Sequence, residues 1–252
     1  MSHSVQIGLQ MYTVRDKATE DMSGTLNAVA KCGYHGVELA GFQELGLNEL
    51  DRALKSNRLE LVSAHVGYGE LCSNTDEWCR NLKALGAKRV TIPHISGPAL
   101  DGEGLAKTAA EINRIQKVLS ASGIELSFHN HHQVFENGRL DRFMESCPDL
   151  KIELDTYWAA FADVDPVSLM KRLGDRLTLI HIKDMLPEVQ LNRSNPDAPN
   201  PNILEGVIDI KAILDQAAEQ GVAWAIVEMD IPIGDSMEAV RVSRHNLIAE
   251  GF

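Results

Sequence analysis

Short apolar segments that end on a polar side chain recur along the chain and alternate with helical patterns. The apolar runs 150–154 and 177–180 are followed by Asp155 and His181, respectively. Between them, an acidic cap, a proline and an apolar stripe predict one helix, which ends at a glycine. A strand, helix, strand unit whose strands both carry a metal-capable residue at the carboxyl end is typical of an open α/β sheet or a (β/α)8 barrel.

The same unit recurs from one end of the chain to the other. We expect eight strands, over residues 5–12, 36–40, 59–65, 89–94, 124–131, 150–154, 177–180 and 223–228. The amphipathic patterns between them predict helices over residues 23–32, 48–55, 75–85, 105–122, 167–173, 207–220 and 236–249. Strands and helices that alternate over 252 residues match one (β/α)8 TIM barrel better than two small domains, so we predict a single barrel domain over residues 1–252.

One connection is much longer than the others. His181 and Glu228, which end the last two strands, are 47 positions apart, whereas the preceding strand-end residues are separated by 24–37 positions. The excess is the segment 186–204, which is rich in proline and asparagine. Connections of this length inside a compact domain are usually functional or disordered. Because the segment follows the carboxyl end of a strand, we predict that it forms an active-site lid.

Composition and charge narrow the class of partner. The formal net charge of −12 argues against a surface that follows nucleic-acid phosphates, so we expect no nucleic-acid partner. No apolar run approaches the roughly 20 residues that span a bilayer, and the first residues lack the pattern of a signal peptide. The four cysteines show no Cys-x-x-Cys spacing, which indicates free thiols. We therefore expect a soluble, cytoplasmic protein with no membrane partner and a small-molecule ligand; the sequence leaves a homo-oligomer open.

Seven ionisable side chains end, or nearly end, the predicted strands. They are Glu38, His65, His94, His131, Asp155, His181 and Glu228. A single histidine at a strand end is more often a hydrogen-bonded packing residue than a ligand. In a barrel, however, all strands converge at one mouth, where so many carboxylates and imidazoles would repel or stay unsatisfied without a cation. We therefore predict a bound divalent ion, and mixed carboxylate and imidazole ligands suit Mn²⁺, Co²⁺, Fe²⁺ or Zn²⁺.

Several segments together resemble one known family. The resemblance rests on residues 7–16, 33–41, 63–67, 128–131, 153–158, 181–184 and 205–209. They are similar to the sugar phosphate isomerase/epimerase group of xylose isomerase-like TIM barrels, which also includes the inosose dehydratases and, more distantly, the endonuclease IV repair enzymes. The resemblance covers nearly the whole chain and implies a metal-binding barrel enzyme, but it does not define the substrate.

The resemblance implies a metal that residues of the fifth to eighth strands hold. Asp155, His181 and Glu228 match the family's ligands on the last three of these strands. On the fifth strand, where epimerases of the group have a glutamate, this chain has two histidines, and we choose His131 as the fourth ligand. Several relatives carry Asp-x-x-His on the sixth strand, whereas Trp158 replaces that histidine here, so we expect one metal and not the multi-zinc site of the nucleases.

The resemblance also suggests roles for the other polar residues. Glu228 and Glu136 are candidate bases. Lys183 is a candidate acid or electrostatic partner, and the alternative is a structural ion pair with Asp184 or Asp155. We expect substrate contacts from Glu38, His65, His94, His129, Asn130 and Trp158, with the indole of Trp158 as a stacking platform for a sugar.

Together these residues predict a metal-dependent isomerase or epimerase that acts on a keto-sugar or a related polyhydroxy carbonyl compound by removing the proton α to the carbonyl. Two alternatives use the same site, namely a lyase or dehydratase that eliminates β to the carbonyl and an enzyme that cleaves keto-glycosides. A sugar-binding barrel without activity would not require the metal ligands. A nuclease of the endonuclease IV type would need more zinc ligands and a basic face.

Overall fold

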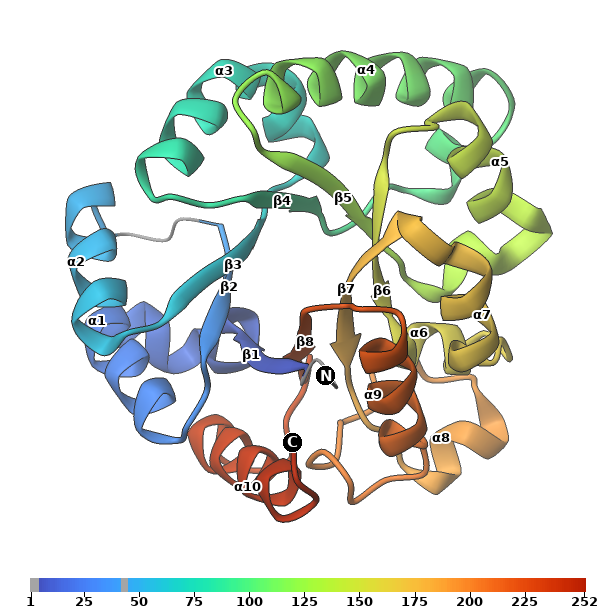
Figure 1. Cartoon of the computed structure of the whole chain (residues 1–252). Helices are drawn as coiled ribbons and strands as arrows, with labels where there is room; N and C mark the ends of the chain where they lie inside the picture. The colour runs from blue at the N-terminus through green and yellow to red at the C-terminus, as the bar shows by residue number, and fades with distance from the viewer. Residues whose placement is uncertain (1–4, 42–44) are drawn as a thin grey trace.

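The predicted barrel is present in the computed structural model, which describes residues 5–41 and 45–252. Eight parallel strands close in sequence order, and the last strand pairs with the first (Figure 1). The strands are β1 Gln6–Gln10, β2 Gly36–Ala40, β3 Glu60–His65, β4 Arg89–Ile92, β5 Glu125–His129, β6 Lys151–Asp155, β7 Leu177–Ile182 and β8 Trp224–Val227. The expectation of a (β/α)8 TIM barrel is therefore confirmed.

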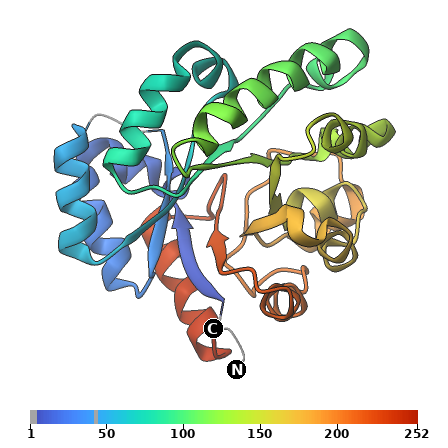
Figure 2. The same ribbon diagram turned by 45° about the horizontal axis from the view of Figure 1, so that its top comes forward.

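Helices surround the strands on the outside of the barrel (Figures 1 and 2). The α-helices of the described residues are α1 Arg15–Lys31, α2 Leu47–Asn57, α3 Tyr68–Ala84, α4 Gly102–Ser120, α5 Arg139–Ser146, α6 Thr156–Phe161, α7 Pro166–Leu173, α8 Pro187–Asn192, α9 Ile210–Glu219 and α10 Ser236–Ala249. Short 3-10 helices span Met11–Val14, Gly97–Leu100, His132–Gly138 and Gly174–Arg176. This arrangement directs the carboxyl ends of all strands to one mouth.

The strands are buried on both faces because one face points into the barrel and the other packs against helices. In β7, for example, only Thr178 is less than fully buried. The outer face of the sheet contacts the apolar stripes of the helices, and the expected stripe of α4 is buried at Ile112, Ile115 and Leu119. Continuous apolar strands and amphipathic helices thus give one layered core, in which the few buried polar residues stand out.

Four strands end earlier than we predicted, namely β1, β4, β5 and β8, and the first α-helix begins earlier. β1 ends at Gln10, whose side chain caps the 3-10 helix that follows. β5 ends at His129, so His131 lies beyond the strand. Trp158 lies in α6, because the Asp155 carboxylate accepts the Trp158 backbone N–H at 2.9 Å and starts a helix directly after β6. Local capping contacts, which apolar periodicity does not report, set these ends.

The long segment 186–204 is folded and attached to the barrel. It contains α8, and its buried Asn200 donates its backbone N–H to the Ile231 carbonyl at 2.8 Å. The Asn200 amide oxygen also accepts the backbone N–H of Asp230 at 2.9 Å. Val189 and Ala198 pack in one cluster with Trp158. The segment therefore touches residues beside the barrel mouth, and its role as a lid stays a prediction.

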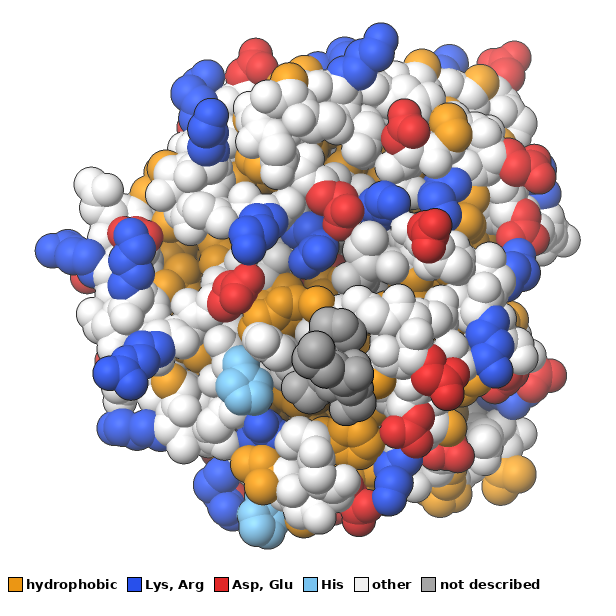
Figure 3. All heavy atoms as spheres, in the orientation of Figure 1, with side chains coloured by type: hydrophobic (Ala, Val, Ile, Leu, Met, Phe, Trp, Pro, Cys, Tyr) orange, Lys and Arg blue, Asp and Glu red, His pale blue; other side chains and the backbone are white. Residues whose placement is uncertain are grey.

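The helices and one face of the surface show the distribution of apolar and charged side chains. Within the described ranges, no helix combines the length and apolar character that crossing a membrane requires. Basic and acidic side chains are interspersed over the face shown in Figure 3, and neither sign dominates it. A face with this mixed charge does not offer the basic stripe that follows a phosphate backbone. The cytoplasmic location and a homo-oligomeric state stay predictions.

Candidate active site

Metal-capable side chains from several strands meet at the carboxyl end of the barrel. They form two overlapping groups, and within each group the ligand atoms lie within 4.8 Å of one another and every residue is buried. The first group is His129, Asp155, His181 and Glu228, and the second is His65, His129, Glu153 and His181. Because the groups share two histidines, they make up one continuous cluster.

The two ring nitrogens of His181 face different carboxylates. Its Nδ1 lies 3.0 Å from Glu228 Oε2. Its Nε2 lies 2.6 Å from Glu38 Oε2 and 3.0 Å from Glu153 Oε1. A histidine that ligates a metal usually donates its other ring N–H to a carboxylate. An Nε2 proton donated to Glu38 leaves the Nδ1 lone pair beside Glu228 for an ion.

A buried ammonium group balances the acidic side of the cluster. Lys183 Nζ lies 2.7 Å from Asp230 Oδ2, 3.0 Å from Glu228 Oε2 and 3.2 Å from Asp155 Oδ2, and the side chain is fully buried. Asp184, the other partner that we considered, accepts backbone N–H groups instead, including that of Gly206 at 2.8 Å. The ion pair with Asp155 is present, but it is one of three contacts between Lys183 and carboxylates.

Burial and nearby charges act in opposite directions on the pKa values of the cluster. Burial would lower the pKa of His65, but the Glu38 and Glu153 carboxylates outweigh it and raise that pKa to about 10. Burial would raise the pKa of Glu228, yet Lys183 and His181 hold it well below its usual range. Burial opposes the charge of Lys183 too, and its three carboxylate partners raise its pKa well above normal. At neutral pH Glu228 is therefore ionised and Lys183 is charged.

The cluster has the composition and the unsatisfied atoms that a divalent ion requires. Asp155 Oδ2 and Glu38 Oε1 are buried and have no hydrogen-bond partner among the described residues. Buried polar atoms without partners are rare, and a bound ion would satisfy such an oxygen. Two carboxylates and two imidazoles within 4.8 Å match the ligands of Mn²⁺, Fe²⁺, Co²⁺ and Zn²⁺. The residues present therefore fit a metal.

A cavity of about 370 Å³ opens beside the cluster and gives a ligand access to it. This volume is within the range of small-molecule sites. The cavity is lined by Tyr12, Ala40, His65, Pro93, His129, His131, Glu228 and Asp230. Members of both metal-capable groups therefore face the space in which a small molecule would lie.

The expected fourth ligand lies outside both metal-capable groups. His129, and not His131, contributes its ring nitrogens to them. The His131 ring lies 5.2 Å from the His129 ring and 5.3 Å from the His94 ring, and it lines the cavity. Burial, aided by the charge of Lys183, lowers the pKa of His131 to about 2, so the ring is neutral. Because β5 ends at His129, that residue points to the barrel axis from the strand itself.

Three other expected residues have contacts different from those we predicted. Glu136 lies at an extended break within the 3-10 segment His132–Gly138, with its side chain 57% exposed and paired with Arg139 at 2.8 Å, so it is outside the cluster. Asn130 is fully buried, and both ends of its amide bind the Asp155 backbone, at 2.9 and 3.1 Å. Trp158 is 5% exposed and packs on His131 and on aromatic neighbours below the cavity. Its indole is covered and does not offer an open stacking face.

Sequence reasoning missed two acidic residues of the site. Glu153 contacts three imidazoles of the cluster, and Asp230 lines the cavity and binds Lys183. Glu153 precedes Asp155 by two residues, and Asp230 follows Glu228 by two. Side chains two residues apart on a strand share a face. This spacing was a sign in the sequence that Glu153, which lies on β6, belongs to the mouth. Asp230 lies beyond the end of β8 at Val227, where strand alternation does not place it.

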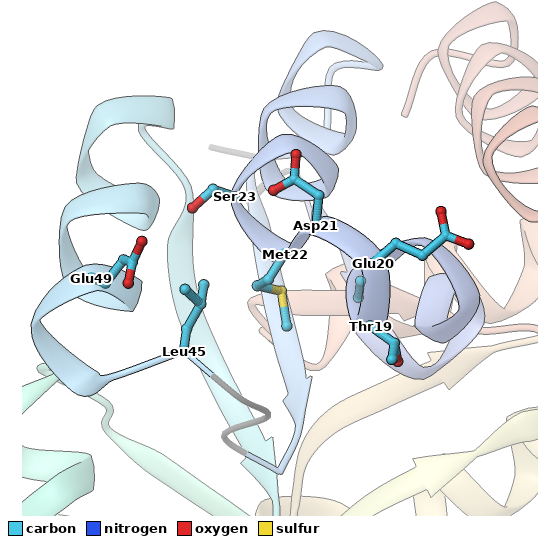
Figure 4. Close-up of a pocket in the computed structure, with 8 residues that line it drawn as sticks. Thr19, Glu20, Asp21, Met22, Ser23, Leu45 and Glu49 are labelled. Atoms are coloured by element: carbon cyan, nitrogen blue, oxygen red, sulfur yellow. The ribbon is translucent and has the colours of Figure 1, made fainter.

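A second hollow, of about 510 Å³, lies away from the mouth between α1 and α2 (Figure 4). It is larger than the mouth cavity and includes Glu20, Asp21 and Glu49 in its lining. Figure 4 shows that these three carboxyl groups do not converge on one point. They belong to neither metal-capable group of the described residues. The chemistry therefore belongs to the smaller cavity, beside the buried cluster.

The fold and the site define the class of this protein. The model of the xylose isomerase-like TIM barrel family matches residues 26–246, and the chain belongs to this family. An inosose dehydratase of Mesomycoplasma hyopneumoniae (strain 7448) is 30% identical over 205 residues, which are 72% of this chain and 67% of the relative.

Solved structures give the same fold. A sugar phosphate isomerase/epimerase from Parabacteroides distasonis ATCC 8503 superposes with a TM-score of 0.81 at 19% identity, over 97% of this chain and 98% of that one. The IOLI protein, whose structure has a binding zinc atom, superposes with a TM-score of 0.78 at 14% identity, over 97% of each chain. At these identities the superpositions show the fold alone, while the family assignment rests on the sequence matches.

Proposed function

We propose that this protein is a metal-dependent isomerase or epimerase that acts on a keto-sugar or a related polyhydroxy ketone. The observation that carries the proposal is the group His129, Asp155, His181 and Glu228, whose ligand atoms lie within 4.8 Å of one another beside a cavity of about 370 Å³. An ion held there would polarise the carbonyl and an adjacent hydroxyl of a bound sugar, which acidifies the carbon-bound proton between them.

The residues of the chain supply the base and the compensating charge. Glu228 lines the cavity and is kept ionised, so its carboxylate can accept the proton α to the carbonyl. The electron pair of that C–H bond moves toward the carbonyl oxygen, and the buried Lys183 ammonium, 3.0 Å from Glu228, compensates the negative charge that develops. Return of the proton to the former carbonyl carbon, together with transfer of the adjacent hydroxyl proton to the former carbonyl oxygen, completes an isomerisation. Its return to the opposite face of the original carbon completes an epimerisation.

A dehydratase is the second candidate, and the 30% identity to an inosose dehydratase favours it. The first half of the reaction is the same removal of the proton α to the carbonyl. Loss of a hydroxyl group from the β carbon as water then follows in place of proton return. An enzyme that cleaves a keto-glycoside differs in turn only in its leaving group, so the fate of the substrate distinguishes the three reactions.

Deuterium exchange tests the shared first step. We expect that incubation in D₂O with Mn²⁺ or Zn²⁺ and a panel of ketoses, keto-inositols and 3-keto-glycosides places deuterium next to the carbonyl of one panel member, as seen by NMR. Labelled substrate and isomer indicate an isomerase or epimerase, whereas an unsaturated or cleaved product indicates a lyase. An isomerase that moves a hydride directly would form product without label, so product formation is recorded in parallel.

A matched pair of variants assigns the base. Glu228→Gln should abolish exchange and product formation, whereas Glu219→Gln, on the exposed surface of α9, should leave both unchanged. If no panel member reacts and ligands bind equally well with and without metal, the protein is a sugar-binding barrel and the proposed catalysis is wrong.

A further inference from the structure

We propose that Glu153 is a positioning residue that orients the imidazoles of His129 and His181 so that their free ring nitrogens face the same metal site. The inference rests on the proposed function, because it concerns the metal that the function needs. It assigns a role to a fully buried carboxylate that does not itself line the cavity.

One oxygen of Glu153 contacts the ring nitrogens that point away from the proposed metal. Glu153 Oε1 lies 3.2 Å from His129 Nδ1 and 3.0 Å from His181 Nε2. The opposite nitrogens face the other group, since His129 Nε2 lies 3.7 Å from Asp155 Oδ2 and His181 Nδ1 lies 3.0 Å from Glu228 Oε2. A neutral imidazole carries one proton, so a carboxylate on one nitrogen leaves a lone pair on the other.

Glu153 is held in place from its other side. Its Oε2 accepts a hydrogen bond of 2.7 Å from the Thr91 hydroxyl, which also lies 2.7 Å from the Ser127 hydroxyl and 3.0 Å from that of Ser63. These hydroxyls come from β3, β4 and β5, so the carboxylate is attached to three neighbouring strands. A carboxylate fixed in this way defines the direction of the N–H groups that it accepts.

The backbone of β6 supports the same reading. The pairing of β6 with β7 shifts register between Ile152 and Glu153. Irregular strand pairing of this kind re-aims a side chain and is common beside active sites. The pairing of β2 with β3 shifts in the same way next to Glu38, whose Oε2 lies 2.6 Å from His181 Nε2. Both carboxylates that contact His181 Nε2 thus lie at irregular points of the barrel.

The alternative is that Glu153 is itself a metal ligand, in the group with His65. Both of its oxygens already have partners, Oε1 with imidazoles and Oε2 with Thr91. Asp155 Oδ2, in contrast, is buried and accepts no hydrogen bond among the described residues; its nearest cation is Lys183 Nζ at 3.2 Å. The group with Glu228 therefore contains a carboxylate oxygen that is free to ligate an ion, whereas Glu153 has the contacts of a supporting residue.

Metal affinity and imidazole protonation test the assignment. The dissociation constant for Zn²⁺ is measured by competition with a chromophoric chelator, and ¹⁵N NMR of histidine-labelled, Zn²⁺-loaded protein reports which ring nitrogen is protonated. The wild-type protein should carry protons on His129 Nδ1 and His181 Nε2. Glu153→Met removes the acceptor at similar volume and should weaken Zn²⁺ binding about 10-fold to 100-fold. It should change the protonation of His129, whereas Glu38, 2.6 Å from His181 Nε2, should keep that proton of His181 in place.

The conservative variant separates positioning from packing. Glu153→Gln keeps an oxygen that can accept from the imidazoles, so it should retain the wild-type protonation pattern and bind Zn²⁺ more tightly than Glu153→Met. If Glu153→Met does not fold, Thr91→Val, which frees Glu153 Oε2, should weaken Zn²⁺ binding in the same direction. Asp155→Asn, which alters a proposed ligand, should abolish Zn²⁺ binding and shows the effect expected when a ligand is lost.

The outcomes distinguish the two proposals. If the folded Glu153→Met protein, or Thr91→Val in its place, binds Zn²⁺ like wild type with the same protonated nitrogens, the positioning role is wrong and the metal site stands. If Glu153→Met and Asp155→Asn both abolish binding completely, Glu153 is a ligand and not a positioning residue. If the wild-type protein binds no divalent ion, the proposed function and this inference are both wrong.

Discussion

Replacing Lys183 by methionine should destabilise the protein strongly when no metal is present. The lysine is fully buried and within 3.2 Å of three carboxylates, from Asp155, Glu228 and Asp230. Opposite unit charges about 3 Å apart attract by roughly 5 kcal/mol per pair at an effective dielectric constant of about 20. Repulsion among the carboxylates and the desolvation of the ammonium offset much of this attraction.

The net loss follows from what the substitution leaves behind. Removal of one partner of a buried ion pair typically lowers the free energy of unfolding by about 3–5 kcal/mol, because the remaining charge is buried without compensation. That is a large share of the roughly 5–15 kcal/mol that stabilises a typical protein. With a urea m-value of about 3 kcal/mol/M, we expect the midpoint of unfolding to fall by about 1–2 M.

Lys211→Met is the matched control. Lys211 pairs with Glu250 at 2.5 Å on the surface, where its side chain is 54% exposed. Exposed ion pairs contribute little to stability, so this substitution should leave the urea midpoint of unfolding nearly unchanged.

Divalent metal should restore much of the stability of Lys183→Met without restoring turnover. An ion near Asp155 and Glu228 supplies positive charge to the carboxylates that lost the lysine, and it stabilises the folded state by mass action. The assay is urea unfolding followed by circular dichroism, with and without Mn²⁺. Two results would refute the account of Lys183 as the charge that balances the metal ligands. One is that Lys183→Met and wild type unfold at the same urea concentration without metal. The other is that the difference between their midpoints is the same with and without Mn²⁺.

Two further predictions concern pH and the long segment. The pKa of His65 is raised to about 10 in the folded protein, whereas it is about 6.5 in the unfolded chain. The charged imidazole therefore stabilises the fold fully below pH 6.5, and this contribution is lost as the pH rises toward 10. Urea unfolding of the metal-free protein should show a free energy of unfolding that falls over this pH range, and His65→Asn should reduce the fall. Shortening segment 186–204 within its mostly exposed residues 191–197, which keeps Val189, Ala198 and Asn200 in place, should raise KM or abolish turnover with little change in melting temperature. An unchanged kcat/KM would show that the segment is only a connection.

The strands and helices could be predicted because each contains several apolar residues whose spacing along the chain indicates the element. Apolar runs define the strands, and the stripe at Ile112, Ile115 and Leu119 defines the buried face of α4. The ends could not be predicted equally well, since they depend on single side chains. Gln10 and Asp155 each start a helix where the apolar pattern continues.

The choice between the two histidines of β5 shows where strand periodicity fails. His129 and His131 are two residues apart, so alternation places both on the same face. β5 ends at His129, and of the two histidines only His129, which the strand holds, belongs to a metal-capable group of the described residues. Glu136 lies outside the cluster for a related reason, since the chain beyond the strand turns into a 3-10 helix with an exposed face.

The excess negative charge of the cluster explains why it needs a cation that the chain does not supply. The carboxylates of the cluster belong to Glu38, Glu153, Asp155, Glu228 and Asp230. They outnumber its cations, which are Lys183 and, when both imidazoles are counted as charged, His65 and His181. Excess negative charge that is removed from water is unfavourable, and a divalent ion offsets it. A ligand imidazole is neutral, so the occupied site stays slightly negative. A neutral polyhydroxy ketone suits this environment better than an anion placed directly against the carboxylates.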